Sequence, residues 1–183
     1  MKKSVVAHGL VFRPLIAPSA IQQRVAELGR ELDRRYEGSN PVFLAVLNGA
    51  FIFAADLMRA CSFDCEVAFI RLSSYRGSRS TGEVKQVIGL QEDIRGRPVI
   101  IVEDIVDSGR TLTTFLPDLL GMEPASVEIA TLLLKPEMLE FPIQVDYTGF
   151  EIPSSFVIGY GLDYDGLGRN LPGIYQLDNT KSA

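Results

Sequence analysis

The sequence predicts an α/β fold with a mostly parallel central sheet flanked by helices. Residues 42–59 and 98–120 each contain an apolar run rich in Val, Ile and Leu, then a short turn, then apolar residues at helical spacing. Such a run is typical of a strand buried on both faces, and the spacing after it is typical of a helix. Residues 126–134 form another run of this kind. Strands that alternate with helices favour a parallel sheet, and we expect a single domain, 1–183.

Turn residues and apolar spacing define the other elements. Residues 1–17 are short apolar pieces interrupted by Pro14, which favours a peripheral strand or arm. Ser19 is the expected N-cap of an amphipathic helix that continues to Tyr36. The remaining elements are expected, in chain order, as a strand at 42–47, a helix at 51–59, strands at 65–72 and 84–90, a strand from Pro98 that ends in two adjacent carboxylates, a helix to Leu120, and strands at 126–134, 145–152, 156–160 and 174–177.

Composition and charge argue against several classes of function. Hydrophobic residues make up 46% of the chain and charged residues 22%, which is ordinary for a globular domain, and the net charge is −5. An acidic chain is a poor match for nucleic acid or for an anionic membrane surface. No apolar run has membrane-spanning length and no signal-peptide core follows Met1, which predicts a cytoplasmic protein. Cys61, Cys65 and the single histidine, His8, match no common zinc site or catalytic triad, so we expect free thiols.

The stretch from Glu103 to Thr111 carries the strongest functional signal. It reads Glu-Asp-Ile-Val-Asp-Ser-Gly-Arg-Thr and joins a strand to a helix. A loop of small and polar residues before a helix forms an anion site, because its N–H groups and the positive end of the helix point at the ligand. Glu103 and Asp104 would repel a bare phosphate, but they suit a ligand whose phosphate is accompanied by sugar hydroxyls or Mg²⁺. A ribose 5-phosphate unit meets these requirements.

This stretch resembles the signature with which type I phosphoribosyltransferases bind 5-phosphoribosyl pyrophosphate (PRPP), in the form found in hypoxanthine-guanine phosphoribosyltransferases. An ordinary strand-to-helix turn is the alternative. The resemblance implies the fold of that family, with a small hood formed by the two chain ends. It also implies that Glu103 and Asp104 hold the ribose hydroxyls and serve as Mg²⁺ ligands, and that Asp107 is the general base at purine N7 or the acceptor that orients it. The residues implied to hold the PRPP phosphate are Asp107, Ser108, Gly109, Arg110 and Thr111.

Two further loops match the family in position. Leu47-Asn48-Gly49 follows a strand where the family has its pyrophosphate-binding loop, although the family often has a basic residue in place of Asn48. The loop works with Asn48 if backbone N–H groups bind pyrophosphate, and it loses affinity if a cation is needed. Residues 73–83 resemble the family's lid, in which Ser74 and Tyr75 close over pyrophosphate and keep water from a ribosyl cation. The alternatives are a plain turn for residues 47–49 and a hairpin tip for residues 73–83.

The last third of the chain supplies the residues implied for the purine. Lys135 matches the family lysine that bonds the exocyclic oxygen of a 6-oxopurine, and an ammonium, which only donates, disfavours the amino group of adenine. Phe156 is implied to stack on the purine, and Val157 to read its edge through main-chain groups. Asp163 is implied to hold a second Mg²⁺ near the purine, and Arg169 to contact pyrophosphate. The alternatives are a surface lysine for Lys135 and simple core packing for Phe156 and Val157.

Taken together, the motifs imply a purine-salvage enzyme. It would transfer the 5-phosphoribosyl group from PRPP to hypoxanthine or guanine, giving IMP or GMP and pyrophosphate, with Mg²⁺ as cofactor. The expected partners are these small molecules and other copies of the chain, in a homodimer or homotetramer, with no nucleic acid and no membrane. The alternatives are a phosphoribosyltransferase for another base such as xanthine, a regulator of the same fold that senses PRPP or a nucleotide, and a nucleotide-binding scaffold without catalysis.

Overall fold

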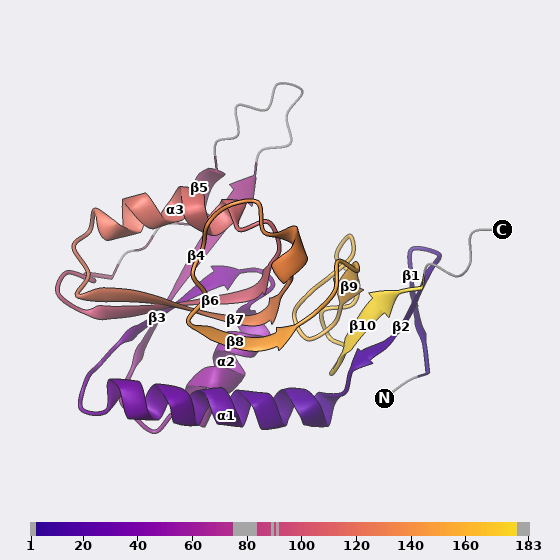
Figure 1. Cartoon of the computed structure of the whole chain (residues 1–183), viewed down its shortest axis with the longest axis horizontal. Helices are drawn as coiled ribbons and strands as arrows, with labels where there is room; N and C mark the ends of the chain where they lie inside the picture. The colour runs from indigo at the N-terminus through magenta and orange to yellow at the C-terminus, as the bar shows by residue number, and fades with distance from the viewer. Residues whose placement is uncertain (1–2, 75–83, 89, 91, 179–183) are drawn as a thin grey trace.

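Two β-sheets form the framework of the chain (Figure 1). The computed structural model describes residues 3–74, 84–88, 90 and 92–178. The larger sheet has the strand order β5-β4-β3-β6-β7-β8, and all neighbouring strands are parallel except β4 and β5. Its strands are β3 (Val42–Leu47), β4 (Glu66–Ser74), β5 (Val84–Ile88), β6 (Pro98–Val106), β7 (Ser126–Leu134) and β8 (Tyr147–Glu151). The predicted, mostly parallel central sheet is therefore confirmed.

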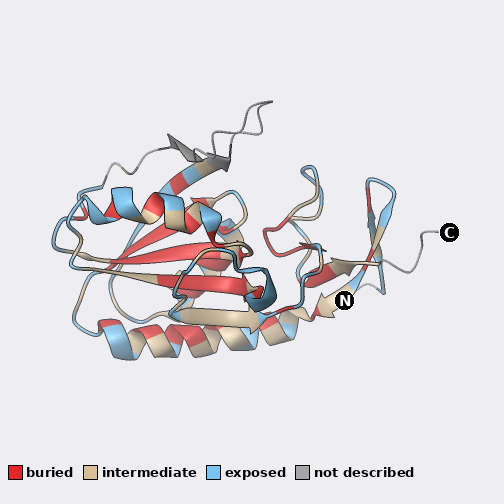
Figure 2. Ribbon diagram, turned by 45° about the horizontal axis from the view of Figure 1, so that its top comes forward, coloured by how far each residue is buried: buried red, intermediate tan, exposed pale blue. Residues whose placement is uncertain are grey.

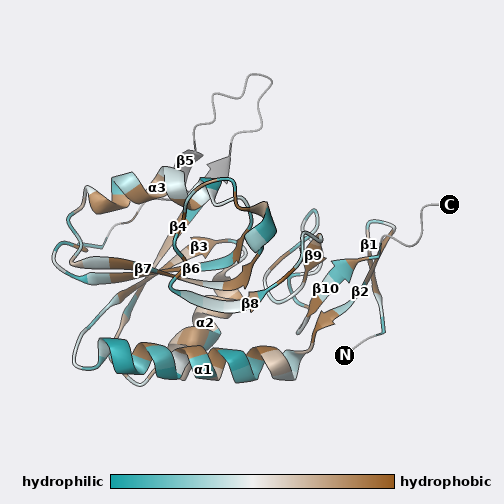
Figure 3. Ribbon diagram, in the orientation of Figure 1, coloured by the Kyte–Doolittle hydropathy of each residue, from teal (hydrophilic) through white to brown (hydrophobic). Residues whose placement is uncertain are grey.

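Helices cover both faces of this sheet. Helices α1 (Pro18–Tyr36) and α2 (Phe51–Ala60) pack on one face, and α3 (Arg110–Leu120) packs on the other (Figure 1). Figure 2 shows the buried residues concentrated on the central strands, and Figure 3 shows that these strands are largely hydrophobic. The two cores include Leu28, Phe43 and Phe53 on the α1 side, and Ile70, Ile101 and Phe115 on the α3 side. Among the described residues, no helix is both long enough and apolar enough to span a membrane.

The smaller sheet joins the two ends of the chain. Its strand order is β1-β2-β10-β9, and all its neighbours are antiparallel. The strands are β1 (Val5–Ala7), β2 (Leu10–Ile16), β9 (Val157–Ile158) and β10 (Ile174–Leu177). In Figure 1 this sheet lies on the right, beyond the N-terminal end of α1. It forms the predicted hood, and residues 1–17 contribute two strands to it where we expected one strand or an arm.

Two boundaries near functional residues differ from the expectation. Helix α1 begins at Pro18 with Ala17 as its N-cap, so Ser19 is not the cap. Proline suits this first position because its φ is already helical and it lacks the N–H that a first turn leaves unpaired. Strand β6 continues past both carboxylates, because its pairing with β7 extends to Val106 opposite Leu134.

The other differences have similar local causes. Strand β4 extends to Ser74, which pairs with Val84, so the first residue of the predicted lid pair ends a strand. Tyr75 lies outside the described residues. Strand β8 starts later than expected, because the carboxylate of Asp146 accepts the N–H of Ile129 at 2.8 Å beside it. Strand β9 is short because the three residues from Gly159 to Gly161 have positive φ and turn the chain away.

Candidate active site

The loop between β6 and α3 forms the predicted phosphate cradle. A cavity of about 80 Å³ opens in this loop. Gly109 is the N-cap of α3 with φ +79°, and a Cβ there would lie 3.1 Å from the side chain of Ile143, so the position favours glycine. The carbonyl of Ser108 accepts the N–H groups of Glu140 and Phe141 at 3.1 and 3.2 Å, which holds the loop in place. The cavity is lined by Glu103, Ile105, Val106, Asp107, Ser108, Gly109, Arg110, Thr111 and Leu112.

The two adjacent carboxylates of β6 sit in a poorly solvated place. Burial raises the pKa of Glu103 well above its usual value, and the neighbouring Asp104 carboxylate raises it further. Burial also raises the pKa of Asp104 to about 6, although the N–H of Ile105 donates to it at 2.8 Å and lowers that pKa in part. Burial makes the ionised forms of both carboxyl groups unfavourable. A bound cation or a set of hydroxyl donors would stabilise these ionised forms.

The loop before α2 closes against these acids. The Leu47–Asn48 peptide is cis. A Cβ on Gly49 would lie 1.4 Å from Oδ2 of Asp104, so only glycine fits there. The predicted pyrophosphate loop and the predicted ribose carboxylate are therefore in direct contact.

A second cavity, of about 230 Å³, joins the central sheet to the hood. Its lining brings together Asp104, Ile105, Asp107, Lys135, Phe156, Val157, Leu162 and Asp163. Phe156 is 44% exposed, although it meets the ring of Tyr164 edge-on at 5.5 Å, whereas Val157 is buried. An exposed aromatic face over a cavity suits a flat heterocycle. The residues predicted for the purine, from four separate segments of the chain, thus share one cavity.

Lys135 and Asp107 form an ion pair inside this cavity. Nζ of Lys135 lies 2.8 Å from Oδ2 of Asp107, and the lysine side chain is 9% exposed while that of Asp107 is 46% exposed. The register of the sheet sets this contact, because the N–H of Lys135 donates to the carbonyl of Val106 at 3.0 Å. The ammonium holds the carboxylate in one place and still has other donors for a ligand.

Asp163 and Arg169 belong to the turn-rich segment between β9 and β10. Nη2 of Arg169 lies 2.6 Å from Oδ1 of Asp163, and Nη1 donates to the carbonyl of Gly161 at 2.6 Å. The N–H of Gly166 donates to Oδ2 of Asp163 at 2.7 Å. Arg169 also lowers the pKa of Asp104, while Asp163 raises it, so both groups act on the buried acids. The structure therefore places the two residues beside the predicted ribose site.

The donor set suits Mg²⁺, although it is no closed metal cage. Among the described residues, no group of three or more His, Cys, Asp and Glu side chains is arranged to hold a metal ion. Glu103, Asp104 and Asp163 offer carboxylate oxygens, and burial, the main cause of the raised pKa of the first two, disfavours their ionised forms, which a bound cation would stabilise. Mg²⁺ typically binds one or two carboxylates together with substrate phosphates, which is the arrangement that such an open set allows.

Several contacts of the site were not predicted from the sequence. The structure adds Ile105 and Leu162 to the lining of the second cavity and pairs Lys135 with Asp107. The alternation of Gly159 and Gly161 around Tyr160 was the available signal for a tightly packed backbone. The two cysteines are free thiols, as predicted, and burial raises the pKa of Cys61 to about 12.

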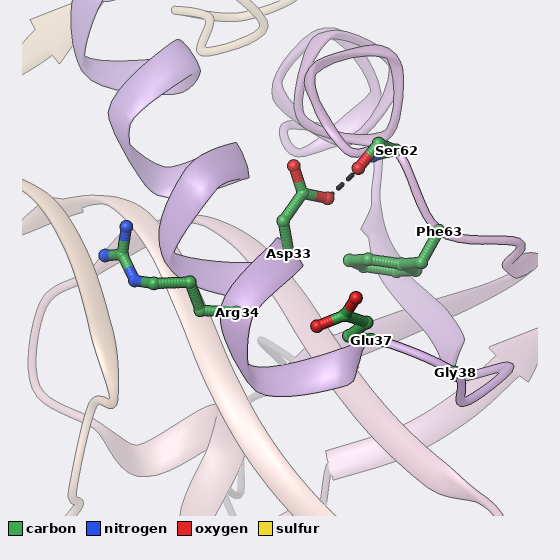
Figure 4. A pocket seen from close by; sticks show the side chains of 6 residues that line it. All are labelled: Asp33, Arg34, Glu37, Gly38, Ser62 and Phe63. Atoms are coloured by element: carbon green, nitrogen blue, oxygen red, sulfur yellow. Dashed lines mark hydrogen bonds between the residues drawn. The ribbon is translucent and has the colours of Figure 1, made fainter.

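A further cavity lies at the C-terminal end of α1 (Figure 4), and its lining shares no residue with the two cavities above. It measures about 410 Å³. Oδ1 of Asp33 accepts the N–H of Ser62 at 2.6 Å, which ties α1 to the segment after α2, and Arg34 points away from Phe63. The cavity is lined by Asp33, Arg34, Glu37, Gly38, Ser62 and Phe63. It contains none of the predicted site residues, so size alone does not locate the site.

The raised pKa of Asp104 leads to a prediction about stability. A folded-state pKa of about 6, against 3.8 for a free aspartate, means that the folded chain loses stability as the pH rises from about 4 to 6. A shift of this size corresponds to about 3 kcal/mol, and the partial exposure of Asp104 reduces the expected effect to about 2 kcal/mol. An Asp104→Asn variant should therefore be about 2 kcal/mol more stable than the parent at pH 7 and equal to it near pH 3.5.

The measurement is urea unfolding of both proteins across this pH range, in buffer with a chelator so that no metal contributes. A matched control is Asp118→Asn, which changes an exposed carboxylate of α3. A stability difference that does not vary with pH would contradict the assignment.

The family of this chain is now established by comparison. The chain belongs to the phosphoribosyltransferase family, because the family model described as phosphoribosyl transferase domain matches residues 17–165. The resemblance noted in the sequence and the predicted fold are thereby confirmed.

The chain is also similar to individual proteins of this family. A hypoxanthine-guanine phosphoribosyltransferase of Lactococcus lactis is 44% identical over 159 residues, which cover 86% of each chain. The crystal structure of a hypoxanthine phosphoribosyltransferase from Staphylococcus aureus superposes with a TM-score of 0.87 at 38% identity, and 91% of each chain is covered. A bifunctional protein TilS/HprT of Listeria innocua is 46% identical over 167 residues, which make up 90% of this chain but only 26% of that protein.

Proposed function

We propose that this chain catalyses transfer of the 5-phosphoribosyl group from PRPP to hypoxanthine or guanine, in purine salvage. The observation that carries the proposal is the cavity in which Lys135, Asp107 and Phe156 meet next to the phosphate cradle. In the reaction, purine N9 attacks C1 of PRPP, the bond from C1 to the pyrophosphate oxygen breaks, and pyrophosphate leaves with the electron pair. The proton on purine N7 passes to Asp107.

Each part of the ligand has a chemically suitable partner. The cradle at the start of α3 takes the 5-phosphate, because loop N–H groups and a helix N-terminus favour an anion. Glu103 and Asp104 accept from the ribose hydroxyls. Phe156 stacks on the base, and Lys135 donates to O6. The 6-amino group of adenine also donates, so it would face the ammonium without an acceptor, and this disfavours adenine.

The pyrophosphate end of the ligand would lie at the loop Leu47-Asn48-Gly49 and at Arg169. Gly49 contacts Asp104, and Arg169 influences the same carboxylate, so both are near the ribose end of the cradle. Asn48 has no charge, so the loop would bind pyrophosphate through neutral donors, namely its backbone N–H groups and the side-chain amide of Asn48. Ser74 and Tyr75 are proposed to close over this end during turnover and keep water out.

Mg²⁺ is the proposed cofactor, with Glu103, Asp104 and Asp163 as the residues that would hold it. Bound Mg²⁺ would chelate the pyrophosphate group and neutralise charge on the leaving group. Asp163 is engaged with Arg169 in this structure, and metal binding would free the arginine for pyrophosphate. The carboxylates of β6 would then be fully ionised at neutral pH.

We further propose that the chain works as a homodimer or homotetramer. Large apolar side chains are exposed at the start of α2 and on one face of β4, whose alternate residues Ala68 and Ile70 are buried. They are Phe51, Val67 and Phe69. Exposed apolar groups on neighbouring elements favour burial against a second copy of the chain.

The direct test measures, by chromatography, the formation of IMP or GMP by the purified chain from PRPP with hypoxanthine or guanine. We expect IMP, GMP or both in the presence of MgCl₂ and neither when EDTA replaces it. If PRPP binds, as judged by calorimetry, but no base is converted, the proposed function is wrong, and a sensor of PRPP or nucleotides becomes the better account. An electrophoretic shift with nucleic acid would then support that account.

A further inference from the structure

Tyr160 makes an unusual buried contact between two distant parts of the chain. It lies in the segment that follows β9, and its hydroxyl donates to Oδ2 of Asp56 on α2 at 2.5 Å. The ring is buried, and Tyr160 has φ +49°, which is rare for an aromatic residue. Burial and the Asp56 carboxylate both raise the pKa of Tyr160, so its hydroxyl keeps its proton and remains a donor. A residue held in this conformation needs compensating contacts, and this hydrogen bond is one of them.

The two residues of this hydrogen bond each lie close in sequence or structure to a segment proposed to bind pyrophosphate. Asp56 is on α2, which begins directly after the loop Leu47-Asn48-Gly49. Tyr160 precedes Gly161, and the carbonyl of Gly161 accepts from Arg169 at 2.6 Å. The N–H of Gly161 in turn donates to the carbonyl of Arg169 at 3.0 Å. The tyrosine therefore anchors the residue that positions Arg169.

The two segments also touch through their glycines. A Cβ on Gly161 would lie 2.1 Å from the carbonyl oxygen of Gly49, and a Cβ on Gly49 would lie 1.4 Å from Asp104. The backbone at Gly161, the backbone at Gly49 and the carboxylate of Asp104 are thus stacked with no space for a methyl group between them. A shift of the Tyr160 segment relative to α2 would open or close this stack, because nothing between the glycines can absorb it.

We propose that Tyr160 and Asp56 are positioning residues for the pyrophosphate half of the cleft. Their hydrogen bond fixes the segment of Asp163 and Arg169 against the loop Leu47-Asn48-Gly49. The inference rests on the function proposed above, and it predicts an effect on pyrophosphate that is separate from any effect on the purine. Leu162 and Asp163 of this segment also line the purine cavity, but the groups proposed to hold the base, Lys135 and Phe156, lie outside the segment that Tyr160 fixes.

The test is a Tyr160→Phe variant, which removes only the hydroxyl. A hydrogen bond to a charged group contributes enough that its loss should weaken pyrophosphate binding about 10-fold. We expect this change in the Kd of pyrophosphate, measured by calorimetry with MgCl₂, and in the KM of PRPP, while the KM of hypoxanthine changes less than about 2-fold. Asp56→Ala should have the same effect, the double variant should add nothing further, and Asp56→Asn should restore most of the affinity.

Arg59→Ala is the matched control, because it removes the ion pair between Arg59 and Asp56 and leaves the tyrosine hydrogen bond in place. It should bind pyrophosphate like the parent. The proposal is overturned if Tyr160→Phe lowers thermal stability but leaves the pyrophosphate Kd unchanged, or if both KM values rise equally. The binding measurement needs no turnover, so a parent chain that binds pyrophosphate but forms neither IMP nor GMP would refute the proposed function and leave this inference testable.

Discussion

Replacing Asp107 with Asn is expected to lower turnover by about 10²- to 10⁴-fold, which is the usual contribution of a positioned general base. The amide keeps the size of the side chain and its place in the cavity, but it cannot take the proton from purine N7. The KM of PRPP should change little, because the phosphate cradle depends mainly on the loop backbone and on α3. The measurement is a single-turnover rate of IMP formation with hypoxanthine.

Asp118→Asn is the control for this variant also, since Asp118 is an exposed carboxylate farther along the helix after the cradle. Its turnover should equal that of the parent. An Asp107→Asn variant with unimpaired turnover would rule out the base role and leave Asp107 at most as a partner of Lys135.

Replacing Lys135 with Ala is expected to have the second large effect, a loss of about 10²- to 10³-fold in kcat/KM for hypoxanthine. The variant loses the donor for O6 and also leaves Asp107 without the ammonium that lies 2.8 Å away. The ratio of kcat/KM for hypoxanthine and adenine should fall toward one, because the group that disfavours the amino group is gone. Both bases are measured by pyrophosphate release from PRPP.

A double-mutant cycle separates these two roles of the lysine. If the ion pair with Asp107 contributes to catalysis, the effects of Lys135→Ala and Asp107→Asn together are smaller than the product of the two single effects. Lys135→Arg keeps a donor-only group and should retain the preference for hypoxanthine. A Lys135→Ala variant that still rejects adenine as strongly as the parent would contradict the assignment to O6.

The apolar runs of this sequence predicted much of the fold. Strands at 42–47, 126–134 and 174–177 occur with the expected limits, since each run is buried and flanked by turn residues. Ser19 was the wrong N-cap because the adjacent Pro18 is an even better start for a helix. Strand β6 was longer than expected because pairing with β7, which no local pattern reveals, continues past Glu103 and Asp104.

The site could be predicted as a set of residues but not as a set of contacts. The position of Lys135 after a parallel strand indicated the ligand crevice, yet its pairing with Asp107 depends on the register between β6 and β7. The hydrogen bond from Tyr160 to Asp56 joins residues 104 positions apart. Such contacts arise only when the backbone segments are brought together, so local sequence patterns carry little information about them.

The measurement that tests the central claim most directly is pyrophosphate release from PRPP and MgCl₂ with hypoxanthine, guanine, xanthine and adenine in parallel. The account predicts release with hypoxanthine, guanine or both, and none above background with adenine. Release with adenine would contradict the claim that this cleft transfers a phosphoribosyl group to 6-oxopurines. The claim would also be contradicted if PRPP binds but none of the four bases causes release.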